Sequence, residues 1–212
     1  MDDRLALPDR SSLAFDDIIR GRRSVRQYQP RPVQREMIMQ VIDAARWAPS
    51  PHGRMPWRFV VLTQPERKTH LAEAMAREWQ HNLEMDRQPP EIVAVRLRKS
   101  KARVEGAPVV IVPCLYLQDL DHYPDAARQQ AETTMAIQSL GAAVQNMLLT
   151  AYQLGLDTGW MCAPLFCPDV VVRALDLDPA LIPQALIMLG YAATDPQRRE
   201  RLPIDTIIAQ WD

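Results

Sequence analysis

The stretch 131–154 is a predicted helix that is apolar on nearly every side, and few folds can accommodate such a helix. Glu132, Gln138 and Gln145 interrupt it, which argues against a membrane span because charged and amide groups are costly inside a bilayer. A helix with no polar face must be buried, either in a large core or against another subunit. The stretch therefore predicts a central helix, favours a homodimer with this helix at the seam, and predicts no membrane partner.

Shorter segments with helical and extended patterns alternate around this helix. Apolar, β-branched runs predict strands, and apolar positions at three- and four-residue spacing predict helices. The predicted strands are 57–62, 108–116, 158–163 and 185–191, and the predicted helices are 13–20, 33–48, 66–82 and 169–175. From the residues alone we expect one α/β layered domain, 1–212, with helices on both faces of the sheet. The polar, proline-broken stretch 84–106 is expected to form a surface excursion or lid with helical pieces.

Charge and cysteine content narrow the classes of partner. The chain has 25 Lys and Arg against 26 Asp and Glu, so no global field attracts nucleic acid or an anionic membrane. Cys114, Cys162 and Cys167 lie in apolar stretches without CxxC spacing, which predicts reduced core thiols and neither a disulfide nor a metal site. The first ten residues contain charges and no apolar run, so no signal peptide is expected. A cytoplasmic protein is the expectation.

The arginine segment, residues 20–28, concentrates positive charge, with four arginines within seven residues. Basic runs are most often solvated faces. Here, however, Ser24 sits among the arginines, and apolar Val25 and Tyr28 interrupt them. That mixture suits a pocket that neutralises a phosphate and hydrogen-bonds its oxygens, because a guanidinium group offers a planar fork of donors. The segment therefore predicts a phosphate-bearing small molecule as ligand.

The proline shelf, residues 48–57, is a loop with three prolines that leads directly into a predicted strand. By itself such a loop is most simply a structural turn. Two separated arginine clusters, 20–26 and 198–201, and the adjacent glycine and tryptophan at 159–160 favour a pocket shared with this shelf. The chain has no GxGxxG, GxxxxGK[ST] or HExxH motif, and no histidine near Ser24 for a nucleophilic triad. The chemistry is therefore expected to belong to a bound cofactor.

These motifs, in this order, resemble those of the nitroreductase family of FMN-dependent enzymes. Family members carry Arg-Arg-Ser-x-Arg-x-aromatic, matched by 22–28, and Ala-Pro-Ser-x-x-Asn-x-Gln-Pro-Trp, matched in part by 48–57. A Gly-Leu-x-x-Gly-Trp-like stretch at 155–160 and a Leu-Gly-Tyr before an arginine-rich tail extend the resemblance over nearly the whole chain. It implies an α+β three-layer sandwich with a mixed, largely antiparallel sheet flanked by helices. It also implies a homodimer that binds one FMN at each subunit interface.

The resemblance further implies how FMN is held. The arginine segment would bind the phosphate, the ribityl chain and the ring edge, and the C-terminal arginines would return to the phosphate. The proline shelf would approach from the partner subunit, and backbone near 159–161 would contact the ring. The implied FMN-binding residues are Arg22, Arg23, Ser24, Val25, Arg26, Pro49, Ser50, Pro51, His52, Gly159, Trp160, Met161, Arg199 and Arg201. No catalytic side chain and no metal are implied, because hydride moves to and from flavin N5.

Two positions of the proline shelf depart from the family pattern. Gly53 stands where the family has Asn, and Met55 stands where it has Gln. Two polar contacts to the flavin or the loop are therefore missing. Weaker FMN binding or a reshaped pocket is expected.

The implied activity is hydride transfer from NAD(P)H or another reduced donor, such as a deazaflavin, through bound flavin to a small nitro, quinone or enoyl acceptor. Within the family, 50–52 and 160–168 most resemble the flavin-reductase domain attached to the glutamyl ligase of coenzyme F-420 biosynthesis. One alternative is thus a free-standing reductase of a dehydro precursor of that deazaflavin, with Lys99, Lys101 and Arg103 meeting a polyanionic tail. Another is a non-catalytic flavin or deazaflavin binder, favoured by the missing Asn and Gln. Near-zero net charge disfavours a nucleic-acid-binding role for the arginine clusters.

Overall fold

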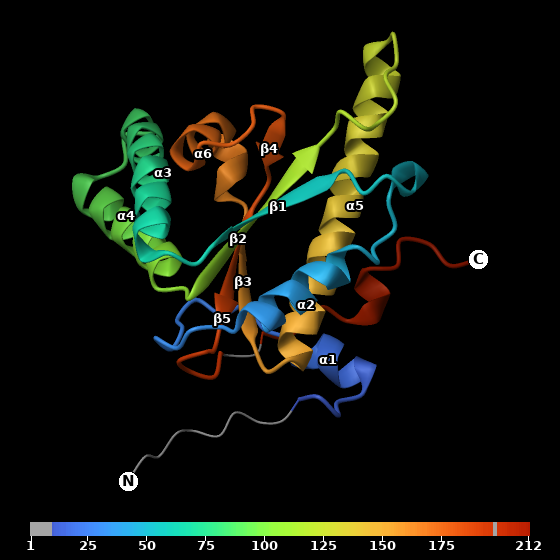
Figure 1. Cartoon of the computed structure of the whole chain (residues 1–212), viewed down its shortest axis with the longest axis horizontal. Helices are drawn as coiled ribbons and strands as arrows, with labels where there is room; N and C mark the ends of the chain where they lie inside the picture. The colour runs from blue at the N-terminus through green and yellow to red at the C-terminus, as the bar shows by residue number, and fades with distance from the viewer. Residues whose placement is uncertain (1–9, 197–198) are drawn as a thin grey trace.

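The computed structural model describes residues 10–196 and 199–212, which form a five-stranded sheet between layers of helices (Figure 1). The strands are β1 (Trp57–Leu62), β2 (Val109–Tyr116), β3 (Asp157–Met161), β4 (Leu181–Pro183) and β5 (Leu186–Gly190). The helices are α1 (Phe15–Gly21), α2 (Arg35–Ala45), α3 (Pro65–Met85), α4 (Pro90–Glu105), α5 (Ala126–Gln153) and α6 (Pro168–Leu175). Three short 3₁₀ turns complete the described elements: η1 (Pro51–Gly53), η2 (Ala163–Phe166) and η3 (Ile204–Thr206).

The sheet has the strand order β1-β2-β5-β3, and β4 pairs with β2 off this path. Every strand pair is antiparallel, and a parallel link occurs at the bridge between Ser24 and Thr158. The largely antiparallel α+β sandwich implied by the resemblance is confirmed. The sequence patterns predict four strands, and the structure adds β4. That strand has three residues and ends in Pro183, so it is too short to show a periodic pattern.

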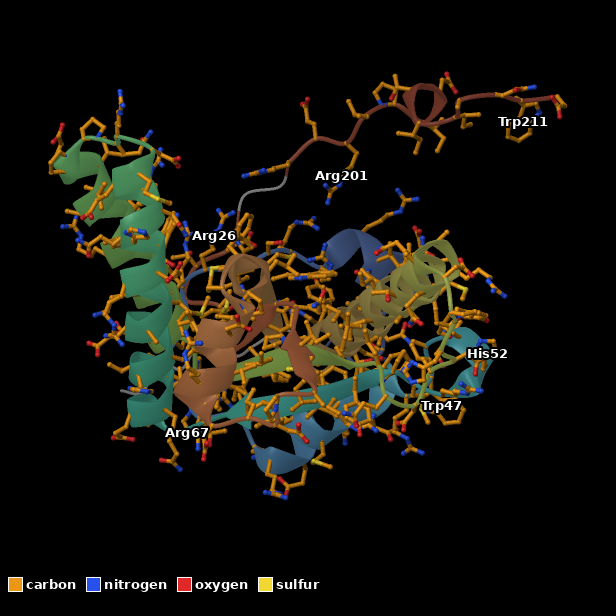
Figure 2. The ribbon with its side chains drawn as sticks, turned by 90° about the horizontal axis from the view of Figure 1, so that it is seen from above. Arg26, Trp47, His52, Arg67, Arg201 and Trp211 are labelled. Atoms are coloured by element: carbon orange, nitrogen blue, oxygen red, sulfur yellow. The ribbon has the colours of Figure 1, made fainter. Side chains whose placement is uncertain are left out.

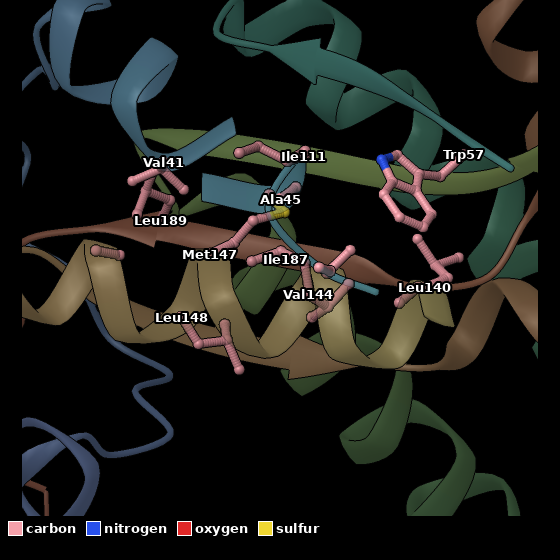
Figure 3. Packing of buried hydrophobic residues seen from close by; sticks show 14 of the residues in the cluster. Val41, Ala45, Trp57, Ile111, Leu140, Val144, Met147, Leu148, Ile187 and Leu189 are labelled. Atoms are coloured by element: carbon pink, nitrogen blue, oxygen red, sulfur yellow. The ribbon is translucent and has the colours of Figure 1, made fainter. Parts of the chain in front are cut away.

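Alternate residues of β2 point into two different hydrophobic cores. Ile111 packs with α2 and α5, while Val112 packs with α3 and α6 on the opposite face. This two-residue period is the geometry of a strand, and burial on both faces explains why the whole strand is apolar. Figure 3 shows the first core, where Val41 of α2 lies near Leu189 of β5 and Met147 of α5 lies near Ile187 of the same strand.

The long helix α5 begins at Ala126, five residues before the predicted start. The Asp125 side chain caps it by accepting a hydrogen bond from Arg128 N at 2.9 Å, a signal that hydrophobic periodicity does not carry. One side of the helix lies in the first core, whereas Met135 and Ile137 are 41% and 45% exposed. A single chain thus buries one apolar side of α5 and leaves apolar residues on another side uncovered.

The stretch 84–106 contains the end of α3 and all of α4, and the two helices form an antiparallel hairpin (Figure 1). Val104 of α4 is buried in the second core. Lys68 of α3 is buried, and its Nζ donates to the carbonyls of Ala107 and Pro108, just before β2. Burial lowers the pKa of this lysine. The hairpin is therefore tied to the sheet at its base, and movement of 84–106 as a lid stays a prediction.

The three cysteines are free thiols in different surroundings. Cys114 and Cys167 are buried, and burial raises their pKa values to about 12 and about 11. Cys162 is exposed, so the prediction of a core thiol is wrong there: the chain leaves the sheet after β3 and turns into η2. Within the described ranges, no cluster of three or more potential metal ligands occurs. No helix in those ranges is long and apolar enough to cross a membrane.

Candidate functional site

The arginine segment is attached to the sheet through its backbone. Val25 N donates to Thr158 O of β3 at 2.8 Å, and Gln29 N donates to Tyr191 O just after β5, also at 2.8 Å. Ser24 forms a β-bridge with Thr158. Val25 is buried between these contacts, whereas Ser24 is exposed. The backbone is thus held like an added edge strand, and side chains on its outer face project away from the sheet.

Gly159 and Tyr28 show how closely the segment packs on β3. A Cβ at Gly159 would lie 2.4 Å from Val25 O, so only glycine allows this approach of two backbones. The Tyr28 hydroxyl lies 3.1 Å from Val25 O and 3.3 Å from Met188 O, which fixes the end of the segment to β5. Burial, with a smaller effect of the nearby Asp157 carboxylate, raises the pKa of Tyr28.

Two of the four arginines are held by the protein itself. Arg20 pairs with Asp16 at 2.6 Å, one turn earlier on α1. Arg23 donates to the backbone carbonyls of Arg20 and Arg22, where α1 ends and carbonyls lose their helical partners. Arg23 therefore stabilises the turn that leads into the segment, and a contact from it to FMN stays a prediction.

Arg22, Arg26 and Arg201 have no acidic partner in the described part of the chain. Burial lowers the pKa of half-buried Arg22, and the positive charges of Arg201 and then Arg23 lower it further. Arg201 is thus close enough to Arg22 to disfavour its charge, although the two are far apart in sequence. Figure 2 shows Arg26 and Arg201 on the same side of the molecule. Like charges gathered without a counter-ion suit an anionic ligand.

A cleft of about 680 Å³ opens beside the arginine segment. Residues 24–28 form one wall, and Lys99 and Arg103, one turn apart on α4, lie on the facing wall. Neither α4 cation has an ion-pair partner within the described ranges. Lys101, which lies between them in sequence, pairs instead with Glu73 at 3.3 Å. Both walls of the cleft therefore carry positive charge that the protein does not neutralise.

The proline shelf contains three residues in the left-handed region. His52, Gly53 and Met55 have φ angles of 53°, 68° and 49°. This conformation costs a residue with a Cβ roughly 1–2 kcal/mol, and glycine and asparagine tolerate it best. Glycine at position 53, where the family has asparagine, thus keeps the left-handed backbone conformation but removes the side-chain amide. Ser50 Oγ accepts a hydrogen bond from Met55 N at 3.1 Å and closes the turn.

Arginines of the shelf region bind the acidic loop that precedes α5. Arg54 Nη1 donates to Asp121 Oδ1 at 2.6 Å and to Asp119 O at 3.0 Å. The Arg54 hydrogen bond is the main cause that lowers the pKa of Asp121. Arg58, on β1, pairs with Asp119 Oδ2 at 3.1 Å. These arginines hold the shelf in place and are already neutralised.

His52 faces two carboxylates. Its Nε2 lies 3.4 Å from Glu132 Oε1 and 3.6 Å from Asp121 Oδ2. Glu132 is on α5 and 1% exposed, and neither of its carboxylate oxygens has a hydrogen-bond partner in the described part of the chain. Sequence reasoning used Glu132 only to exclude a membrane span. A charged residue inside an otherwise apolar helix was the signal that could have identified it.

A single chain brings together only part of the predicted set. Ser24, Val25 and Arg26 line the cleft, and Arg201 approaches Arg22 from the C-terminal tail. None of the shelf residues lines this cleft, and Figure 2 shows His52 on a different side from Arg26 and Arg201. Gly159 of β3 joins the group of Ser24, Val25 and Arg26, because it packs directly against Val25. The other predicted residues are Pro49, Ser50 and Pro51 on the shelf, Trp160 and Met161 on β3, and Arg199 in the exposed tail. Such a separation is what a site shared between two copies of the chain requires.

Comparisons with known proteins place the chain among its relatives. The nitroreductase family matches residues 19–191. A protein of Methanothermobacter thermautotrophicus, whose name pairs NADH dehydrogenase with NAD(P)H nitroreductase, is 31% identical over 198 residues. That match covers 92% of this chain and 86% of the relative.

Solved structures agree with that match. A BluB-like flavoprotein from Clostridium difficile has a TM-score of 0.79 at 24% identity, covering 95% of this chain and all of that one. A nitroreductase-type protein from Desulfovibrio desulfuricans, solved in complex with FMN, has a TM-score of 0.73 at 26% identity, with 95% and 98% coverage. Fold, motif order and sequence match agree, and the chain belongs to the nitroreductase family.

Proposed function

We propose that this protein is an FMN-dependent oxidoreductase that passes hydride from NAD(P)H to a small conjugated acceptor. The observation that carries the proposal is the cleft lined by Ser24 and Arg26, beside which Arg22 is subject to the like charge of Arg201 and has no acidic partner in the described residues. Two guanidinium groups match the charge and the oxygen geometry of a phosphate monoester. The FMN complex of the Desulfovibrio relative and the nicotinamide named for the Methanothermobacter relative support the same assignment.

The residues of this chain would bind and orient the cofactor. Arg22 and Arg201 would neutralise the phosphate, the exposed Ser24 hydroxyl would donate to it, and Arg26, which lines the cleft, would bind the ring edge. Bound FMN supplies the hydride-accepting and hydride-donating N5. The backbone contact between the segment and Gly159 keeps these groups at a constant spacing. No side chain has to act as a nucleophile.

We propose further that the protein is a homodimer in which the shelf of one copy meets the arginine segment of the other. Phe15 and Trp47 are 68% and 79% exposed and line a groove with Leu149 of α5. Every described residue of the tail 199–212 is exposed, including Trp211, and Figure 2 shows the tail extending away from the body. Apolar surface of this extent supports a protein interface. Trp47→Glu should yield monomers in analytical ultracentrifugation and lose FMN, and a monomeric wild-type protein would contradict the proposal.

FMN and riboflavin differ by the phosphate and therefore test the cofactor site. Arg22→Ala should lower FMN affinity at least about tenfold, because hydrogen bonds to charged groups contribute 1.5 kcal/mol or more. Its riboflavin affinity should not change. Arg46→Ala is the matched control, because Arg46 is exposed and paired with Asp43 at 2.6 Å. Equal wild-type affinity for the two flavins, measured by fluorescence quenching, would contradict a phosphate site.

Turnover separates an enzyme from a binding protein. The flavin-loaded protein should oxidise NADH or NADPH when a quinone or nitroaromatic acceptor is present. Saturable flavin binding without turnover on any donor would favour the non-catalytic alternative.

A specific observation favours a second candidate, reduction of a dehydro-deazaflavin that carries an anionic tail. Lys99 and Arg103 face the cleft without acidic partners in the described chain, so an acceptor with carboxylates or phosphates remote from its ring would find its charge neutralised there. Replacing both with alanine should raise KM for the anionic acceptor and leave KM for a neutral quinone unchanged. Lys101→Ala, on the ion-paired side of α4, is the control. Equal effects on both acceptors would count against this candidate.

A further inference from the structure

Glu132 is a buried acid whose carboxylate has no hydrogen-bond partner in the described part of the chain. Its side chain is 1% exposed, and both carboxylate oxygens lack a hydrogen-bond partner. A buried carboxylate is strongly unfavourable unless a positive charge compensates it. Within the described residues, the basic group at ion-pair distance is the imidazole of His52, whose Nε2 is 3.4 Å from Oε1. His52 is thus the group placed to compensate a negative charge at Glu132.

The shelf holds His52 toward this acid in a strained backbone conformation. His52 has a φ of 53°, which residues with a Cβ rarely adopt. A strained backbone conformation persists only where neighbouring interactions hold it in place, and such conformations are concentrated at functional sites. Here Arg54 is bonded to Asp121, and Ser50 accepts from Met55 N, so both sides of His52 are restrained. The imidazole has little freedom to turn away from Glu132.

The other charged groups near His52 do not replace Glu132. Asp121 Oδ2 lies 3.6 Å from Nε2, but Arg54 already neutralises Asp121 through a 2.6 Å contact. His122 is exposed and acts on Asp121. With the Nε2 edge of His52 toward the acids, the Nδ1 edge is left for other partners, and the side chain is 43% exposed. The Nδ1 edge of His52 therefore lies at the surface of the shelf.

We propose that Glu132 is a positioning residue that holds His52 as an imidazolium, and that His52 presents this charge to the flavin bound by the partner subunit. The inference rests on the proposed FMN site and homodimer, which set the shelf of one copy against the flavin of the other. A positive charge close to the ring stabilises the reduced, anionic flavin more than the oxidised form. The His52–Glu132 pair would thus raise the reduction potential of the flavin and carry out no chemical step itself.

The reduction potential of bound FMN tests this role. In His52→Gln, binding of reduced relative to oxidised FMN should fall about tenfold, the scale of one lost hydrogen bond to a charged group. Glu132→Gln should lower the potential in the same direction, and the double variant should fall no further than His52→Gln. His122→Gln removes an imidazole from the neighbouring loop and should leave the potential unchanged. A wild-type potential in His52→Gln with FMN still bound would overturn the inference.

Urea unfolding of the FMN-free protein tests the pair without the flavin. His52→Gln leaves the buried charge uncompensated, so it should destabilise the protein. Adding Glu132→Gln should restore stability, because a neutral amide removes that charge. Additive losses in the double variant would overturn the pairing. If the wild-type protein binds no FMN, the proposed function fails and the assigned role falls with it, whereas a failed unfolding cycle with FMN bound refutes only the His52–Glu132 pair.

Discussion

The arginine segment and the proline shelf both carry arginines, but different parts of the chain hold them in place. In the segment the backbone makes the attachments, through Val25 to β3, while Arg22 and Arg26 have no acidic partner among the described residues. In the shelf region the side chains make the attachments, and Arg54 and Arg58 are both paired with acids of the loop before α5. The first region keeps the charges of Arg22 and Arg26 available to a ligand, whereas the second uses its arginine charges to hold its own loop.

This difference shows that the role of an arginine depends on whether its charge is already neutralised. Where backbone hydrogen bonds fix a segment, its guanidinium groups remain available to a ligand. Where the guanidinium groups themselves fix the segment, their net contribution is structural and modest. Substitutions in the two regions should therefore separate ligand binding from folding stability.

The largest effect is expected for the double variant Arg22→Ala with Arg201→Ala. FMN affinity should fall at least about a hundredfold, because two hydrogen bonds to a charged phosphate are lost at roughly 1.5–3 kcal/mol each. The matched pair in the other region, Arg54→Ala with Arg58→Ala, should change FMN affinity by less than about threefold, because exposed ion pairs contribute little. Fluorescence titration measures both. Equal losses of FMN affinity in the two double variants would contradict the proposed difference between the arginine segment and the shelf region.

Gly159→Ala tests the backbone attachment of the segment. The added Cβ would lie 2.4 Å from Val25 O, so the free energy of unfolding should fall by about 2 kcal/mol, as in an overpacked core. FMN affinity should fall with it. Gly141→Ala on α5 is the control, since a Cβ there meets nothing within 4 Å in the chain. A stable Gly159→Ala variant with unchanged FMN affinity would show that the close contact is dispensable.

Tyr28→Phe tests the same attachment through pH. Loss of the hydroxyl contacts should cost about 1 kcal/mol at neutral pH. Because burial raises the folded-state pKa above the ordinary 10.0, the hydroxyl contribution is fully present below that pH and is lost as pH rises beyond it. In urea titrations, the stability difference between wild type and Tyr28→Phe should stay constant at lower pH and shrink once the pH rises above 10.0. A difference that is constant with pH would contradict a buried Tyr28.

The smallest effect is expected for Arg54→Ala alone. Its ion pair with Asp121 is partly exposed, so the loss of stability should be about 0.5 kcal/mol. High salt should reduce the difference from wild type, because exposed pairs are screened. FMN affinity should stay at the wild-type value. A loss of FMN with no loss of stability would place Arg54 among the ligand-binding arginines and sharpen the boundary between the regions.

Local patterns were sufficient for most of the secondary structure. The predicted strand 57–62 coincides with β1, because its β-branched and aromatic residues are an unambiguous strand pattern. The predicted end of the long helix lies one residue beyond the observed end of α5. Local patterns failed where an element is very short, as for β4, or where the chain turns out of the sheet, as at Cys162.

The candidate site also has features that local sequence patterns predict and features that they miss. Residue types and spacing pointed to the arginine segment and the proline shelf, but they could not tell which arginines have partners. Arg54 binds Asp121 across 67 residues, and Glu132 meets His52 across a similarly long stretch of chain. No periodic pattern reports such pairs.

The sequence by itself determined the fold class, the central apolar helix and the presence of two basic regions, because hydrophobic period and residue type act over a few neighbouring positions. Only the tertiary structure decided which charges are neutralised. It subjected Arg22 to the like charge of Arg201, paired Arg54 with Asp121, and placed the carboxylate of Glu132, which has no hydrogen-bond partner in the described chain, against His52. The physical reason is that a charge is compensated by whatever lies within a few ångströms in space, and chain folding alone decides which residues those are.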